Sequence, residues 1–285
     1  MRIRTAGVMD RIPLTPQSRE LGDELRHLRK KFAKGAEFAA QLGWDPSKVS
    51  NIERGKVRPT EKDLAQYLTA CGRDLDCIDE FFDRYRNAFA PYYAQRAHNF
   101  STIMFAEREA TAIMGYSKAT LPDLLRTEDY ATHVLQQRGA TPEQIRLALE
   151  SLRERQRILR SPIRPDCVFY VSERTLTAHL GDDRATMDQL ELLKQLSWAL
   201  RIVPDDNDIP TSTGFVVYER DKFPTTVVVE CDLADVFIHD DAAISRCRTV
   251  LATLSDVALS NAESRDLLSR SLADKYAAVI KAAAS

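Results

Sequence analysis

The stretch GAEFAAQLGWDPSKVSNIERGKVRPT, residues 35–60, decides the fold of the N-terminal part of this chain. It predicts two short helices joined by a tight turn at Gly43. Asp45 followed by Pro46 is typical of a helix start, because the carboxylate caps free backbone N–H groups and proline needs no donor at the first helical position. The first helix has an apolar stripe formed by Phe38, Ala39 and Leu42.

The second helix of this stretch, residues 46–54, carries a polar and cationic face. Val49 and Ile52 are expected to face inward. The outward side chains are of the kinds that bind base edges and phosphates, and we take as candidate DNA contacts Ser47, Lys48, Ser50, Asn51 and Arg54. Short motifs of this size also occur as plain packing. The apolar face, the cap, the polar set and the basic loop that follows agree with one another, and we therefore predict a DNA-reading helix-turn-helix.

The stretch resembles the phage-repressor-like helix-turn-helix of the xenobiotic-response-element (XRE) family of bacterial regulators. The resemblance is strongest in SNIERGKVRPT, residues 50–60, where serine, Ile-Glu, Arg-Gly and Pro-Thr stand at the family's spacing. It implies a structural role for Glu53, paired with Arg29 of the preceding helix. It also implies phosphate contacts from Lys56 and Arg58, and base contacts from Ser47, Lys48, Ser50 and Asn51.

Charge is distributed unevenly along the 285 residues. Residues 1–60 hold 13 Lys and Arg against 7 Asp and Glu, whereas the remainder holds 27 against 35. A basic head on an acidic body is typical of a nucleic-acid-binding domain joined to a second domain. We expect a flexible basic arm over 1–17, a helix-turn-helix domain over 18–90 and a regulatory or dimerisation domain over 91–285.

The apolar periodicity of residues 18–90 predicts five helices and an all-α fold. Ser18 and Thr60 are expected to cap two of these helices. Residues 87–99 are too rich in aromatic side chains for a flexible linker, and we expect a semi-rigid join with two packed rings, Tyr92 and Tyr93.

The rest of the chain predicts an α+β domain with a small, mainly antiparallel sheet. Strands are expected over 167–172, 199–203, 215–219, 225–230 and 236–238. A hairpin is expected around residues 221–224. Helices are expected over 105–116, 128–138, 141–158 and 186–198, with two more at the C-terminal end. The fold class of the whole chain is therefore α+β.

A second resemblance covers residues 105–135, FAEREATAIMGYSKATLPDLLRTEDYATHVL. The stretch is similar to a domain that follows the helix-turn-helix in many actinomycete regulators, WhiJ-like proteins among them. That pattern starts F-x-x-x-E-x-x-A, has a PGLLQT-like core and ends in an aromatic residue and alanine. Phe105 with Glu109 matches the start, with Glu107 also near, and residues 122–127 match the core.

Two core positions depart from the pattern, because Asp123 replaces glycine and Arg126 replaces glutamine. Looser matches follow at Arg153, Arg155 and Gln156, at Ser172-Glu173, at Gln189-Leu190 and in VVVE, residues 227–230. The resemblance implies a transcriptional regulator, often encoded beside a small partner protein in an antitoxin-like arrangement.

No set of catalytic or metal-binding residues stands out. The five cysteines are scattered without a CxxC pair, which predicts buried, reduced thiols and neither a disulfide framework nor a zinc site. His239-Asp240-Asp241 is either part of a metal site or, as we favour, a turn and helix cap. Arg153, Arg155 and Arg157 are either an acid-binding set or, as we favour, a solvated surface. We find no GxSxG, P-loop or GxGxxG motif.

We read the chain as a cytoplasmic, homodimeric actinomycete regulator that binds double-stranded DNA, with no enzymatic activity and no cofactor. No signal peptide or membrane span is evident. The C-terminal domain is expected to supply dimerisation and to take an input from a small partner protein or a ligand. Four aromatic residues are candidates for a ligand pocket or for core packing: Trp198, Phe215, Tyr218 and Phe237.

Two alternatives remain open. In the first, the main role is antitoxin-like binding of a small partner protein, and DNA binding serves autoregulation. In the second, the C-terminal domain is an enzyme controlled by the N-terminal head.

Overall fold

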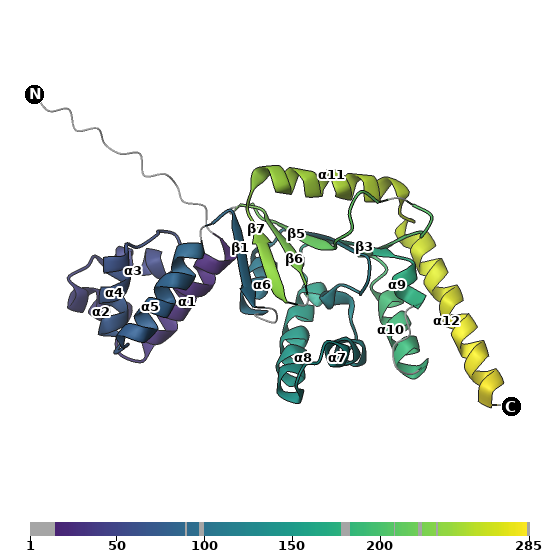
Figure 1. The fold of residues 1–285 in the computed structure, drawn as a ribbon, viewed down its shortest axis with the longest axis horizontal. Helices are drawn as coiled ribbons and strands as arrows, with labels where there is room; N and C mark the ends of the chain where they lie inside the picture. Colours follow the sequence, from purple (N-terminus) through teal and green to yellow (C-terminus); the bar gives the residue numbers. More distant parts are fainter. Residues whose placement is uncertain are drawn as a thin grey trace, which may run out of the picture. The chain divides into compact units, whose positions relative to one another are not determined.

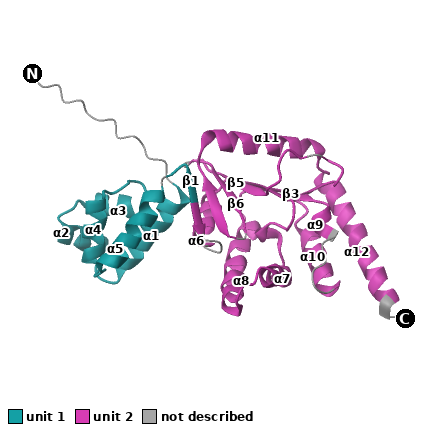
Figure 2. Cartoon of the chain, viewed as in Figure 1, with its two compact units in different colours: residues 1–93 teal, residues 94–285 magenta. Residues whose placement is uncertain are grey.

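The computed structural model describes residues 15–283, except residues 89, 97–99, 178–182, 208, 222–223 and 232. The chain divides into two compact units, residues 1–93 and residues 94–285 (Figure 2). Most of the predicted flexible arm, residues 1–14, lies outside the described residues.

The described residues of the first unit form five helices, in agreement with the prediction: α1 (Pro16–Lys30), α2 (Gly35–Leu42), α3 (Pro46–Glu53), α4 (Glu61–Ala70) and α5 (Leu75–Asn87) (Figure 1). Their apolar faces enclose one core, which includes Leu25, Phe38, Ile52, Tyr67 and Phe81. All five of these side chains are almost completely buried. The helical unit therefore has a hydrophobic core of its own.

The first helix begins earlier than expected. Its N-cap is Thr15, whose hydroxyl accepts from the Ser18 backbone N–H, while the Ser18 hydroxyl completes a capping box. The prediction of Ser18 as the cap was thus wrong by one turn. Pro16 and Gln17, assigned to the flexible arm, are helical and buried. Proline at the first helical position explains the early start.

The sheet of the second half has seven strands among the described residues, in the order β1-β7-β6-β5-β2-β3-β4. The strands are β1 (Tyr92–Arg96), β2 (Ala112–Ser117), β3 (Asp166–Ser172), β4 (Leu200–Val203), β5 (Phe215–Glu219), β6 (Thr226–Glu230) and β7 (Ala234–Ile238). Strands β2, β3 and β4 pair in parallel, and β2, β5, β6 and β7 pair antiparallel. The α+β class is confirmed, with a larger and more mixed sheet than expected.

Two strands were missed in the sequence. The predicted helix over 105–116 is wrong: α6 covers Phe100–Glu109, and the chain then enters β2 in the middle of the sheet. Alanine, glutamate and methionine favour helix in this stretch, but pairing on both edges overrides local propensity. Strand β1 was also missed, and Tyr92, expected to be packed, is 56% exposed.

The remaining helices are α7 (Glu128–Gln137), α8 (Pro142–Gln156), α9 (Arg174–Thr177), α10 (Asp183–Gln195), α11 (Asp241–Val257) and α12 (Asn261–Ala283), with 3-10 turns η1 (Asp123–Leu125) and η2 (Arg157–Arg160). Helix α11 packs on one face of the sheet, against β2, β5 and β6. Figure 1 shows α7 and α8 on the opposite side. In the described residues, no helix is long and apolar enough to span a membrane.

Candidate nucleic-acid interface and a charged cavity

Helix α3 is set at an angle to α2 by a short, well-capped turn. Gly43 ends α2 in the left-handed conformation, with φ 67°, which side chains other than glycine rarely adopt. Asp45 then caps α3 and accepts from the Ser47 backbone N–H at 2.7 Å. Hydrogen bonding from Ser47 lowers the pKa of Asp45, which keeps the cap ionised. The predicted turn and cap are both confirmed.

The inner side of α3 is anchored by a buried ion pair with α1. The Arg29 guanidinium donates to both Glu53 oxygens, at 2.5 and 3.0 Å, and the Tyr67 hydroxyl donates to Glu53 at 2.7 Å. The hydrogen bond to Glu53 raises the pKa of Arg29 against the effect of burial. The predicted pairing of Arg29 with Glu53 is confirmed, and the network fixes the angle at which α3 leaves the core.

Two glycines bring α1 close to the C-terminal end of α3. A Cβ at Gly22 would lie 2.6 Å from the Glu53 carbonyl oxygen. A Cβ at Gly55 would lie 2.7 Å from the Ser18 carbonyl oxygen, and Gly55 has φ +64°. The arginine-glycine step of the motif is therefore required by backbone packing as well as by conformation.

The predicted contact residues on α3 share its outer side. Ser47 and Arg54 are exposed, and Ser50 and Asn51 are partly exposed. Their spacing of three and four residues places them along one face of the helix. In the loop that follows, Lys56 and Arg58 are also exposed. All six side chains are thus at least partly exposed, and their contacts with DNA stay a prediction.

Lys48 differs from the other candidates because its ammonium group is held within the protein. It forms an ion pair with Asp63 of α4 at 2.6 Å and lies 4.1 Å from the centre of the Trp44 ring. This ion pair lowers the pKa of Asp63 although partial burial opposes it. Lys48 was expected to point outward; 39% of its side chain is exposed, and its ammonium group is paired with Asp63. Contact with a base would require it to leave Asp63 and Trp44.

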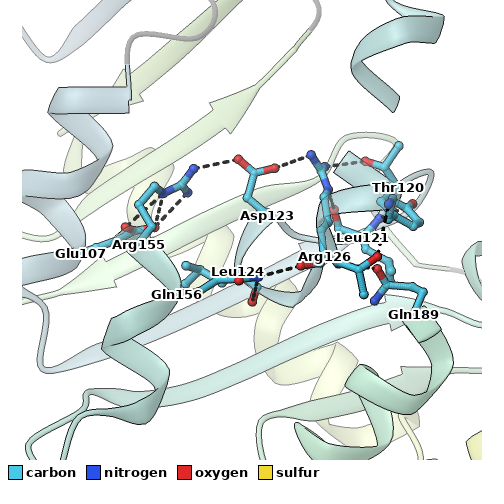
Figure 3. Close-up of polar contacts among 11 residues, drawn as sticks. Glu107, Thr120, Leu121, Asp123, Leu124, Arg126, Arg155, Gln156 and Gln189 are labelled. Atoms are coloured by element: carbon cyan, nitrogen blue, oxygen red, sulfur yellow. Dashed lines mark hydrogen bonds and ion pairs between the residues drawn. The ribbon is translucent and has the colours of Figure 1, made fainter. Parts of the chain in front are cut away.

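The second unit contains a chain of alternating buried charges. Glu107 of α6 and Arg155 of α8 are 3% and 5% exposed, and the Arg155 Nε and Nη2 donate to Glu107 at 2.9–3.1 Å. The Arg155 Nη1 donates to Asp123 at 2.8 Å, and Asp123 also pairs with Arg126 (Figure 3). The expectation that Arg155 belongs to a solvated surface was wrong, since it is the centre of this network.

The two departures from the resembled core motif form a pair. Asp123 and Arg126 bind each other on either side of η1. Burial would raise the pKa of Asp123, but Arg126 and Arg155 together lower it to about 2. Asp123 is therefore ionised at every pH at which the protein is expected to work.

Residues that carry the second resemblance converge on the segment 120–127. Gln156 donates to the Leu124 and Arg126 carbonyl oxygens, at 3.2 and 2.7 Å. Gln189 accepts from the Thr127 backbone N–H and donates to the Leu125 carbonyl oxygen, at 2.7 and 2.8 Å (Figure 3). These side chains fix an irregular loop whose backbone groups lack partners in regular secondary structure.

This fixed segment lines a cavity of about 550 Å³ in the second unit. Of the four aromatic candidates, Phe215 and Tyr218 line the cavity. Phe237 is completely buried. Trp198 is partly exposed and stacks with Arg164, whose guanidinium lies 4.4 Å from the ring centre. Two of the four rings therefore border the cavity, and both of them are also buried in the core.

Sequence reasoning did not identify Glu230 as a residue of this cavity. It ends β6 and lines the cavity beside Cys231. A weak signal was present, because β6 reads TVVVE and alternation places Val228 and Glu230 on one face.

The remaining candidates have structural roles. Asp240 caps α11 by accepting from the Ala243 backbone N–H at 2.8 Å, so the predicted helix cap is confirmed. All five cysteines are free thiols, but only Cys71 and Cys167 are buried, so the expectation of mostly buried thiols was wrong.

Comparison with known families supports the division into two parts. A family model described as a helix-turn-helix domain matches residues 20–81, so the first unit contains a helix-turn-helix of a known class. A second model, described as a domain of unknown function (DUF5753), matches residues 100–270, more than half of the chain. The protein belongs to the DUF5753 family.

Other comparisons add little. The search of curated proteins gave no match. A solved structure of TrmBL2, described as an archaeal chromatin protein with a novel mode of DNA binding, is 10% identical. The match covers 84% of this chain and 99% of that one, with a TM-score of 0.30. A likeness this low supports no inference about fold or function.

Proposed function

We propose that the protein is a sequence-specific transcriptional regulator that inserts α3 into the major groove of DNA. The observation that carries the proposal is the exposure of polar and cationic side chains on α3 and in the loop that follows it, namely Ser47, Ser50, Asn51, Arg54, Lys56 and Arg58. Hydroxyl, amide and guanidinium groups read base edges, and cations in the loop bind phosphates. The opposite side of α3 is fixed by Glu53, so the reading face has one orientation.

The proposal divides the work between the two units. The helical unit reads DNA as one half of a homodimer on a near-palindromic site. The α+β unit supplies dimerisation and receives the input, from a ligand or a small partner protein. We expect a cytoplasmic protein of the XRE and WhiJ-like type, without enzymatic activity. An antitoxin-like role with autoregulation stays the alternative, and co-purification of a small protein encoded beside the gene would favour it.

Selection of bound DNA from a random library with the full chain tests the proposal. We expect enrichment of one motif with two related halves, spaced by about one helical turn or a multiple of it. Retention of DNA without enrichment of any motif would contradict sequence-specific reading. An Arg29→Ala variant is not a test of base reading, because that change disturbs the buried pair with Glu53 in the core.

A further inference from the structure

The cavity of the second unit has the size of a small-molecule site. Its volume of about 550 Å³ falls in the range of about 300–1,000 Å³ that is usual for ligand pockets. One wall is the face of the sheet opposite α11, with Val216, Tyr218 and Val228 among its residues. The other wall is the fixed segment 120–127. All of its lining residues lie within one unit.

The charged side chains beside the cavity are paired with one another. Arg155 uses Nε, Nη1 and Nη2 on Glu107 and Asp123, and both Asp123 oxygens are engaged by Arg155 and Arg126. Two carboxylates and two guanidinium groups therefore neutralise one another. An anionic ligand would have to displace a buried carboxylate to reach Arg155, which would leave an unpaired buried charge.

Glu230 is the exception to this balance. No described side chain donates a hydrogen bond to Glu230 or forms an ion pair with it, although the carboxylate lines the cavity together with Asp123. Glu230 is an exposed residue of the cavity lining. Burial in this hollow and repulsion by Asp123 raise the pKa of Glu230, against the attraction of Arg155 and Arg126. Four cationic side chains also line the cavity, Lys118, Arg126, Arg138 and Arg155. Among the described residues none of them pairs with Glu230, so this carboxylate is the group that lacks a donor.

We propose that the cavity binds a small organic amine, whose ammonium group pairs with Glu230 and whose apolar body lies against Val216, the partly exposed residue of the apolar wall. A charge-assisted hydrogen bond is the strong polar contact that an unpaired carboxylate provides. Apolar contacts with the sheet supply the remaining affinity. The inference refines the proposed input role of the second unit by naming a ligand class. It does not require that the first unit bind DNA.

The test compares three molecules that share an indole body, namely tryptamine, tryptophol and indole-3-propionate. Isothermal titration calorimetry of the full chain at pH 8, without DNA, measures each affinity. We expect binding of the amine and much weaker or no binding of the alcohol and the acid. Glu230→Gln should weaken amine binding by about tenfold or more, the effect of losing a hydrogen bond to a charged group.

Glu173→Gln is the matched control, because Glu173 undergoes the same change outside the cavity lining. It should bind tryptamine as the unchanged protein does. Circular dichroism checks that each variant is folded. If Glu230→Gln does not fold, Val216→Trp narrows the cavity with Glu230 in place and should exclude tryptamine.

Three results would overturn the inference: no binding of tryptamine, equal or better binding of indole-3-propionate, or undiminished amine binding by folded Glu230→Gln. If Glu230→Gln does not fold, undiminished amine binding by Val216→Trp would overturn it. Because the titrations contain no DNA, failure of the DNA-binding proposal would leave their outcome unchanged.

Discussion

The helical unit and the α+β unit both bury charged side chains, but they leave them in different states. In the first unit, Arg29 and Glu53 are buried and paired with each other, and the Tyr67 hydroxyl donates a further hydrogen bond to the Glu53 carboxylate. In the second unit, the network around Arg155 borders a cavity, and Glu230 stands beside it unpaired among the described residues. A buried network in which every charge is paired fixes the geometry of the helices that carry it. A network beside an unpaired carboxylate leaves one polar interaction for a ligand.

The largest effect is expected when the helical unit is produced without the α+β unit. A fragment of residues 1–93 should fold, because its five helices share one core. If dimerisation resides in the second unit, the fragment should be monomeric at micromolar concentration. It should then bind a palindromic site about 10²–10⁴-fold more weakly, because the effective concentration of the second head is lost. Sedimentation and binding titrations measure both properties. A fragment that dimerises and binds as tightly as the full chain would place the dimer interface in the helical unit.

Breaking the closed pair should cost the helical unit much of its stability. Glu53→Ala leaves Arg29 buried without a counter-charge, and we expect a loss of about 3–5 kcal/mol in the free energy of unfolding. Urea denaturation of the helical unit measures it. The control is Glu61→Ala, because Glu61 pairs with Arg86 at the surface, where both side chains are more than half exposed. The control should lose no more than about 1 kcal/mol. Similar losses of unfolding free energy in the two variants would contradict the interpretation that the buried pair of Arg29 and Glu53 stabilises the helical unit more than a surface pair does.

Base reading depends on Asn51, which lies on the outer side of α3. Asn51→Ala should weaken binding to the selected site by about 1–3 kcal/mol and change binding to random DNA little. Fluorescence anisotropy titrations with both DNAs at one salt concentration provide the comparison. Equal weakening on the two DNAs would show that the reading face lies elsewhere.

The loop after α3 should act through charge alone. Lys56→Ala and Arg58→Ala should each weaken binding to every sequence and flatten the dependence of log K on log salt by about one unit, because each phosphate contact releases counterions. Lys30→Ala, an exposed change at the end of α1, is the control and should leave the slope unchanged. An unchanged slope in both loop variants would remove the loop from the interface.

The smallest expected effect concerns the unpaired carboxylate of Glu230. The pKa of Glu230 is raised from 4.5 to about 7 in the folded protein, so ionisation opposes folding and wild-type stability declines as the pH rises through this interval. Glu230→Gln removes that cost, so its stability relative to wild type should be greater at pH 8 than at pH 4. The gain should not exceed about 1 kcal/mol, because solvent in the cavity screens the charge. Thermal unfolding at the two pH values measures it, and a pH-independent difference would contradict the raised pKa.

The predictions from sequence were most accurate where the interactions are local. Gly43, Asp45, Thr60 and the apolar spacing lie within residues 35–60, and each acts on a backbone group or side chain a few residues away. The pair of Arg29 and Glu53, which the resemblance to the XRE family implied, joins two helices of the same unit. The helix-turn-helix and its outer face were therefore predictable from the amino-acid sequence alone.

Pairings over longer distances were not predictable in this way. Strand β2 pairs in parallel with β3, whose partner residues lie more than fifty positions away, and this pairing overrides a local preference for helix. Likewise the ion pair of Lys48 with Asp63 depends on how α3 meets α4. A flexible side chain with several rotamers has no outward direction until its neighbours are placed.

The sequence by itself determined that this chain has a basic helix-turn-helix head, an acidic α+β body and a reading helix over 46–54, because capping, turn conformation and helical spacing act over a few residues. Only the tertiary structure decided that Arg155 is buried and that Glu230 has no partner among the described side chains. Both facts depend on α6, η1, α8 and β6 meeting at one place. The spacing of residues within one helix shows which side chains share a face, but only packing decides which face is covered.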